Sequence, residues 1–190
     1  MMIWWPEVIP TLSTSSIILR PINPEDSESI YKGAQDPEVP KFTTLPTNYT
    51  LDNAITFSKD RAPARHANRS ELIFGIDYLH SINNSTQPLF AGVISLHSID
   101  FSNHRAEVGY WLVKEARNKG IGTAAVELIT EYGLMTMGFR RIDALVDNRN
   151  VASKRLLEKA GYQFEGILKN YVTRPDGNQI DMAIFAATTK

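Results

Sequence analysis

The sequence has no cysteine among its 190 residues. This absence excludes disulfides, thiol nucleophiles and cysteine zinc sites, and it is compatible with a reducing compartment, so we expect a cytoplasmic protein. Metal-ligand spacing is missing as well, because the histidines are scattered singly at His66, His80, His97 and His104. We therefore expect no metal site.

The chain also lacks long runs of charge and long apolar runs. Its formal net charge is −1, which does not favour nucleic acid as a partner, and no apolar stretch is long enough to cross a bilayer. The apolar start, residues 1–10, has no basic region and is interrupted by Pro6, so a signal peptide is not expected. We expect neither nucleic acid nor a membrane among the partners.

The composition is that of an ordinary globular protein. Hydrophobic residues make up 43% of the chain and charged residues 22%, and the length suffices for one substantial core. We expect an N-terminal arm over residues 1–14, with Trp4 and Trp5, followed by a single domain over residues 15–188.

The first half of the chain predicts two helices followed by a meander of strands. We expect, in order, a strand at 17–22, a helix at 24–35, a loop at 36–48 and a helix at 51–62. Strands are then expected at 72–78, 90–96 and 105–113, joined by turns at 81–88 and 100–104. Such short connections favour antiparallel pairing.

The second half alternates helices with strands. We expect a helix at 122–137 that stops at Gly138, a strand at 141–147, a helix at 151–160 capped by Asn150, and closing strands at 162–169 and 180–187. A meander followed by this alternation predicts an α/β (α+β) sandwich around a mixed sheet.

The run Arg117-Asn-Lys-Gly-Ile-Gly-Thr123 links a predicted strand to a predicted helix. Gly120 and Gly122 allow close approach of the backbone, and N–H groups at a helix start can bind the oxygens of a pyrophosphate. Arg117 and Lys119 add positive charge there. The alternative is a tight strand-to-helix turn with two solvated cations.

Several spaced motifs resemble one family when they are taken together. They are Glu107-Val-Gly-Tyr-Trp-Leu-Val113, Arg117-x-x-Gly120-x-Gly122, Asn150-x-x-Ser153 and Glu158-Lys-Ala-Gly-Tyr162. In this combination the chain resembles the GCN5-related N-acetyltransferase (GNAT) superfamily. Within it, the chain is most similar to the RimJ/RimL-like subgroup of ribosomal-protein alanine and serine N-terminal acetyltransferases. The similarity is strongest over residues 105–166.

The resemblance implies a GNAT fold: a mixed, mostly antiparallel sheet of six to seven strands, splayed central parallel strands, and helices on both faces. It implies acetyl-CoA held between the strands at 107–113 and 141–147. The cofactor-binding residues it implies are Leu112, Val113, Arg117, Asn118, Lys119, Gly120, Ile121, Gly122, Thr123, Asn150 and Ser153. Backbone groups of Leu112 and Val113 would meet the pantetheine arm, and one N–H would polarise the thioester carbonyl.

The resemblance also implies direct attack of a primary amine on the thioester, with Glu107 as base and Ser153 as proton donor to the thiolate. A carboxylate in an otherwise apolar strand is costly unless it is paired, which agrees with a functional role. The alternatives are a paired glutamate at an edge, a helix-start hydroxyl at Ser153, and an Asn150 that caps the helix, with or without a cofactor contact.

The favoured acceptor is the N-terminal amine of a protein or peptide, whose pKa near 8 demands little of a base. A polyamine, an amino acid or an aminoglycoside is the alternative acceptor, and acids near Glu25, Asp26, Glu28 and Asp36 make an acidic pocket possible. The chain could instead be a non-catalytic acetyl-CoA-binding module or a dinucleotide-binding fold, the latter disfavoured by Ala125 in place of a third glycine. A monomer or a homodimer is compatible with the sequence.

Overall fold

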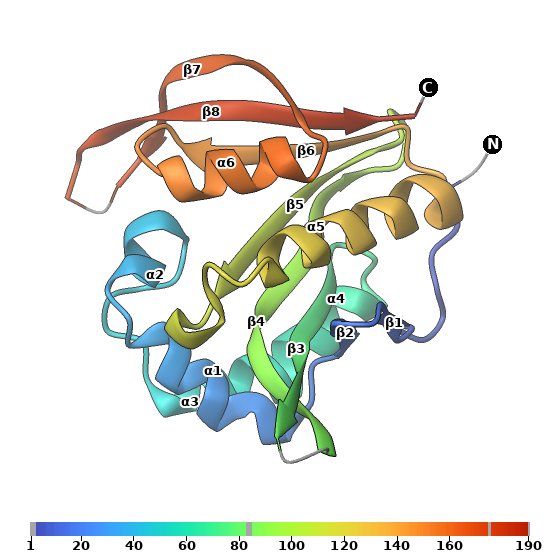
Figure 1. The fold of residues 1–190 in the computed structure, drawn as a ribbon. Coiled ribbons are helices and arrows are strands. Elements are labelled where there is room, and N and C mark those ends of the chain that lie inside the picture. The colour runs from blue at the N-terminus through green and yellow to red at the C-terminus, as the bar shows by residue number, and fades with distance from the viewer. Residues whose placement is uncertain (1–2, 83–84, 175, 190) are drawn as a thin grey trace.

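A computed structural model describes residues 3–82, 85–174 and 176–189. Its centre is one eight-stranded sheet in the order β1-β2-β3-β4-β5-β6-β8-β7 (Figure 1). Neighbouring strands pair antiparallel at every junction except that between β5 and β6, which run parallel. The predicted mixed, mostly antiparallel sheet is therefore confirmed, with more strands than expected.

The strands are β1 (Leu12–Ser13), β2 (Ile17–Pro21), β3 (Leu72–Ile82), β4 (Ser85–Asp100), β5 (Arg105–Leu112), β6 (Arg141–Asp147), β7 (Gln163–Thr173) and β8 (Gln179–Thr188). The predicted count of six to seven strands omitted β1. This strand lies within residues 1–14, the segment expected to be an arm, and pairs with β2. The side chain of Thr14 closes the turn between them by accepting from the N–H of Ser16, at 3.2 Å. A strand of two residues is too short to show alternation in a sequence.

Helices cover both faces of the sheet (Figure 1). One face carries α1 (Ser27–Ala34), α2 (Glu38–Phe42), α3 (Leu51–Thr56) and α4 (Ala62–Ala67), and the other carries α5 (Ile121–Glu131) and α6 (Val151–Lys159). Alternate residues of a strand point to opposite faces. Accordingly Leu72 and Phe74 of β3 join the core beneath α5, whereas Ile73 joins the smaller core beneath α1 and α3.

Two predicted connections are wrong. The loop expected at 36–48 contains α2, which starts where the carboxylate of Asp36 accepts from the N–H of Glu38 at 3.0 Å; five residues are too few for a clear helical period. The turn expected at 81–88 is mostly strand, because β3 runs to Ile82 and β4 starts at Ser85. Ladder bonds use the backbone, so polar side chains do not prevent this pairing. Residues 83–84 lie outside the described part.

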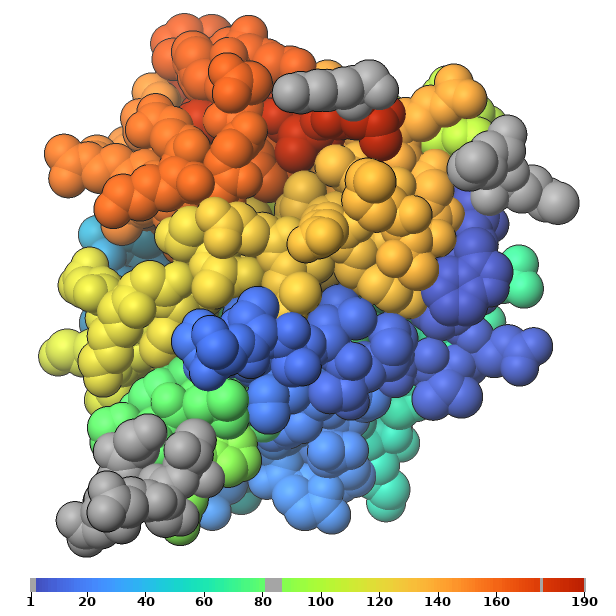
Figure 2. All heavy atoms as spheres, turned by 45° about the vertical axis from the view of Figure 1, so that its right-hand side comes forward, coloured from blue at the N-terminus to red at the C-terminus, as the bar shows by residue number. Residues whose placement is uncertain are grey.

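The N-terminal residues lie along α5 and the π-helical turn Tyr132–Met137 that continues it (Figure 2). The N–H of Trp4 donates to the carbonyl of Met137 at 2.8 Å, and the indole of Trp5 donates to the carbonyl of His66 at 3.2 Å. These bonds hold Trp4 and Trp5 against the helices of the fold. Among the described helices, none is long and apolar enough to span a membrane.

Candidate active site

The two parallel strands separate shortly after they meet. β5 and β6 pair at only three positions, the last being Glu107 opposite Asp143. Beyond this point β5 stays paired with β4 as far as Leu112, and β6 stays paired with β8 as far as Asp147. The facing edges of β5 and β6 therefore carry backbone groups that no strand pairing uses. This is the splayed geometry that the family resemblance implied.

The end of β5 offers one backbone N–H to this gap. The N–H of Val113 donates to the carbonyl of Ala91 at 2.9 Å, and the carbonyl of Val113 accepts from Ala116 at 3.0 Å. Successive N–H groups of a strand point in opposite directions, so the N–H of Leu112 points away from β4 and toward β6. Of the two predicted residues, Leu112 is thus the one whose N–H faces a ligand in the gap.

The glycine loop leads directly into α5, which begins at Ile121. Gly120 is the N-cap, with φ 79°, and a Cβ there would meet nothing within 4 Å. Gly122 differs, since a Cβ on it would lie 2.6 Å from Leu156 and 3.0 Å from Leu112. Gly120 therefore keeps the space above the helix start open, while Gly122 lets α5 pack closely against α6 and β5.

The two cationic side chains of the loop, Arg117 and Lys119, contact other residues of the chain. Arg117 forms an ion pair of 2.8 Å with Asp36 and donates twice to the carbonyl of Leu112, at 2.9 and 3.1 Å. Lys119 lies over the ring of Tyr78, with its Nζ 5.4 Å from the centroid. Arg117 thus ties the end of α1 to the end of β5, and the free donors at this helix start are the first backbone N–H groups of α5.

The cleft is lined by most of the predicted loop residues. Its volume is about 2470 Å³. From the loop, the lining residues are Arg117, Asn118, Gly120, Gly122 and Thr123. Ile121 is buried in the core instead, and Lys119 points toward Tyr78.

The start of α6 meets β5 through a pair of hydroxyls. Asn150 caps the helix as predicted, since its side chain accepts from the N–H of Ser153 at 3.0 Å. The Oγ of Ser153 lies 2.6 Å from the hydroxyl of Tyr110. Burial raises the pKa of Tyr110 to about 12, against the opposing effect of this hydrogen bond. The hydroxyl of Tyr110 is therefore protonated at neutral pH.

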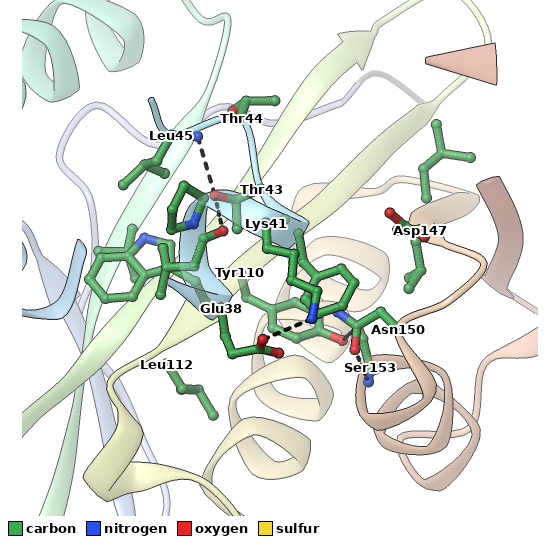
Figure 3. A pocket seen from close by; sticks show the side chains of 18 of the residues that line it. Glu38, Lys41, Thr43, Thr44, Leu45, Tyr110, Leu112, Asp147, Asn150 and Ser153 are labelled. Carbon is green, nitrogen blue, oxygen red and sulfur yellow. Dashed lines mark hydrogen bonds and ion pairs between the residues drawn. The ribbon is translucent and has the colours of Figure 1, made fainter. Parts of the chain in front are cut away.

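Tyr110, which the sequence motif at 107–113 contains without assigning it a role, packs against the core and also lines the cleft. The alternation of β5 contained the signal: Tyr110 shares a face with Val108, and that face looks toward α5 and α6. Figure 3 places Tyr110, Asn150 and Ser153 on one side of the cleft and the α2 pair of Glu38 and Lys41 nearby.

Glu107 lies on the opposite face of β5 from Tyr110, because odd and even positions of a strand alternate. Its side chain is 22% exposed and lines the cleft. Burial, with a smaller contribution from the negative charge of Asp143, raises the pKa of Glu107 from 4.5 to about 7. A carboxyl group with this pKa can exchange a proton readily at neutral pH.

Comparison with known proteins agrees with this geometry. Residues 16–163 match the family model described as acetyltransferase (GNAT) domain. The chain is 30% identical over 179 residues to the uncharacterized N-acetyltransferase YoaA of Bacillus subtilis (strain 168), covering 94% of this chain and 97% of YoaA. It is 29% identical over 97 residues to the spermidine N(1)-acetyltransferase of Escherichia coli (strain K12), covering 50% and 52% of the two chains.

A solved structure shares the fold over the whole chain. Mycobacterium smegmatis RimJ in complex with CoA-disulfide aligns with a TM-score of 0.79 at 22% identity, covering 100% of this chain and 90% of RimJ. The diverging strands and the open helix start lie within the residues that the family model matches. The chain therefore belongs to the GNAT family, as an N-acetyltransferase that takes its acetyl group from acetyl-CoA.

Proposed function

We propose that this enzyme acetylates the N-terminal amine of a protein or peptide. An α-amine has a pKa near 8, so roughly a tenth of it is neutral at pH 7, whereas a lysine side chain has a pKa near 10.4. A carboxylate whose pKa is about 7 can take a proton from an α-ammonium group more easily than from a lysine ammonium group, because the α-amine is the weaker base. The likeness to RimJ in fold is compatible with this acceptor.

The charged residues that line the cleft support an N-terminal amine over a polyamine as the acceptor. Three of its acids are already paired with cations that also line it: Glu38 with Lys41, Glu71 with Arg65, and Asp147 with Arg149 and Arg174. A polyamine needs several unpaired carboxylates to hold its several positive charges. A cleft in which three of the five lining acids are neutralised in this way supports an acceptor that brings one positive charge.

Three of the four acids that could have made an acidic pocket near α1 are also paired with cations. Asp26 binds the guanidinium of Arg20 at 2.7 Å, Glu28 pairs with Lys32, and Asp36 pairs with Arg117. The small-amine alternative retains one supporting observation, the partial similarity to the spermidine enzyme over half of the chain. It remains the second candidate for this reason.

The proposed reaction gives each group one role. Glu107 takes a proton from the amine, and the N–H of Leu112 stabilises the negative charge that develops on the thioester oxygen. A donor in this position is worth roughly 3–4 kcal/mol. Ser153, supported by Tyr110, donates a proton to the departing thiolate. The first N–H groups of α5, opened by Gly120, hold the pyrophosphate of the donor.

Under this proposal Asn150 and Val113 position other groups and do not contact the cofactor themselves. Asn150 positions Ser153 by capping α6, and Val113 contributes through its bond to Ala91, which holds the end of β5 in place. A cytoplasmic location, a monomeric or homodimeric state, and the division into an arm and one domain stay predictions.

A thiol-release assay with acetyl-CoA tests the acceptor. The panel contains tetrapeptides that begin with Ala or Ser, the same peptides with blocked N-termini, a blocked peptide with one lysine, spermidine and an aminoglycoside. We expect turnover with the free N-termini alone, and fragmentation mass spectrometry should locate the acetyl group on the α-nitrogen. Turnover with spermidine or the lysine peptide in place of the free N-termini would refute the proposed acceptor.

A further inference from the structure

A histidine that the reaction above does not use lies directly beside its base. In the register of β4 and β5, His97 stands opposite Glu107, and cross-strand partners project from the same face. The Nε2 of His97 is 4.0 Å from the Oε1 of Glu107. His97 also lines the cleft.

The surroundings hold the ring in this place. A Cβ on Gly109 would lie 2.8 Å from Nε2, so the ring occupies space that any larger residue at 109 would fill. The other ring nitrogen, Nδ1, lies 3.0 Å from the hydroxyl of Ser98 on the exposed side. When Nδ1 carries the proton and donates it to Ser98, Nε2 is a free acceptor facing Glu107.

The overall reaction requires a route of this kind. The amine enters as an ammonium ion and loses two protons on the way to the amide. The C–N bond forms, the C–S bond breaks, and the thiolate takes one proton. One proton per turnover must therefore leave for solvent. Glu107 is largely buried, and an acceptor bound in front of it shields the side that opens to the cleft.

We propose that His97 relays this proton from Glu107 to solvent. The proposal rests on the assignment of Glu107 as base. The Oε1–H bond of Glu107 breaks as an N–H bond forms at Nε2 of His97, and the Nδ1 proton then leaves toward Ser98 and water. The gap between Nε2 and Oε1 is about 1 Å longer than a direct hydrogen bond, and a small rotation of the Glu107 side chain toward the fixed ring closes it. His97 acts through Glu107 and is a positioning residue for proton transfer.

Charged groups of both signs surround His97 and Glu107. Glu71, which precedes β3, and Arg65 of α4 face His97 with opposite charges, and Asp143 of β6 faces Glu107. Burial lowers the pKa of His97 from its ordinary value of 6.5, with Glu71 opposing the change. With the pKa of Glu107 raised and that of His97 lowered, protonated His97 is the stronger acid of the two, so a proton that reaches its ring passes on readily to water.

The test compares His97→Gln with the wild-type enzyme, using the peptide that turns over best in the panel above. Glutamine places an amide nitrogen near the position of Nε2 but does not titrate. We expect kcat to fall about tenfold, less than the roughly 10²–10⁴-fold that a direct acid–base group contributes, with KM for acetyl-CoA unchanged. His80→Gln, on an exposed part of β3, is the matched control and should match the wild type.

Two readouts separate a relay from a structural role. Below neutral pH, kcat/KM of the wild type should fall more steeply than first order, because both Glu107 and His97 must be unprotonated; His97→Gln should fall with first-order steepness. Added imidazole should restore the rate of His97→Ala as its concentration rises. A folded His97→Gln variant with wild-type kcat and an unchanged acid limb would overturn the relay.

The failure of the relay is distinct from the failure of the proposed function. If the wild type turns over spermidine instead of peptides, the acceptor proposal is wrong and the His97 comparison is made with spermidine. If Glu107→Gln retains wild-type turnover, the base assignment is wrong and the relay is wrong with it. If Glu107→Gln is inactive and His97→Gln is fully active, the relay alone is refuted.

Discussion

Replacing Glu107 by Gln should make the protein more stable and less active at the same time. Folding raises the pKa of Glu107 from 4.5 to about 7. At about 1.36 kcal/mol per pH unit, the ionised carboxylate destabilises the fold by about 3 kcal/mol above neutral pH. Glutamine has the shape of the protonated acid and avoids this loss.

The sign of the pH dependence follows from the direction of the shift. Below the pKa of the unfolded chain, Glu107 is protonated in both states and the Gln variant gains nothing. The gain grows as the pH rises through the interval between 4.5 and about 7, and it is constant above this interval. The free energy of unfolding of the wild type should therefore fall, relative to that of Glu107→Gln, as the pH rises through this window.

Thermal unfolding at about pH 5 and about pH 8 measures this difference. One kcal/mol shifts the melting temperature of a domain of this size by roughly 2–4 °C, so the variant should melt roughly 6–12 °C higher at the alkaline pH and only slightly higher at the acidic pH. Glu158→Gln makes the same chemical change on an exposed part of α6 and should not shift the melting temperature.

The same variant is assayed for turnover, where loss of a general base costs about 10²–10⁴ in rate. A Glu107→Gln variant that is no more stable than the wild type at about pH 8, or whose gain does not depend on pH, would refute the reasoning on burial. Added stability with unchanged turnover would instead refute the role of Glu107 as base.

Three further predictions test the rest of the site. Ser153→Ala and Tyr110→Phe should each lower kcat without changing KM for acetyl-CoA, and the double variant should lose no more than the worse single one, because the hydroxyls act as a unit; additive losses in steady-state kinetics would contradict this. Gly122→Ala should cost about 1–3 kcal/mol of stability through overpacking, seen in urea unfolding, and weaken acetyl-CoA binding in calorimetry. Arg117→Lys should weaken acetyl-CoA binding as much as Arg117→Ala, since lysine keeps the charge but loses the hydrogen-bond geometry of the guanidinium. If the lysine variant retained binding, Arg117 would act only through its positive charge on the phosphates.

The sequence alone determined the features that depend on one turn of chain. Asn150 caps α6 because its short side chain reaches the N–H three residues on. Gly120 and Gly138 stand with positive φ at the start of α5 and at the end of its π-helical continuation, as glycine permits. The longer strands could also be predicted, since their apolar residues recur with the period of a buried sheet. The spacing of the motifs is a property of the sequence itself, and it was sufficient to predict the family.

Only the tertiary structure decided which groups meet across the sheet. Tyr110 and Ser153 are 43 residues apart in sequence, and their contact exists because β5 and α6 converge at the gap that β6 opens. Arg117 turned out to hold Asp36 and Leu112, and Gly122 turned out to serve packing. The pairing of His97 with Glu107 depends on strand register. Such contacts are set by long-range packing, which a periodic pattern along one chain does not encode.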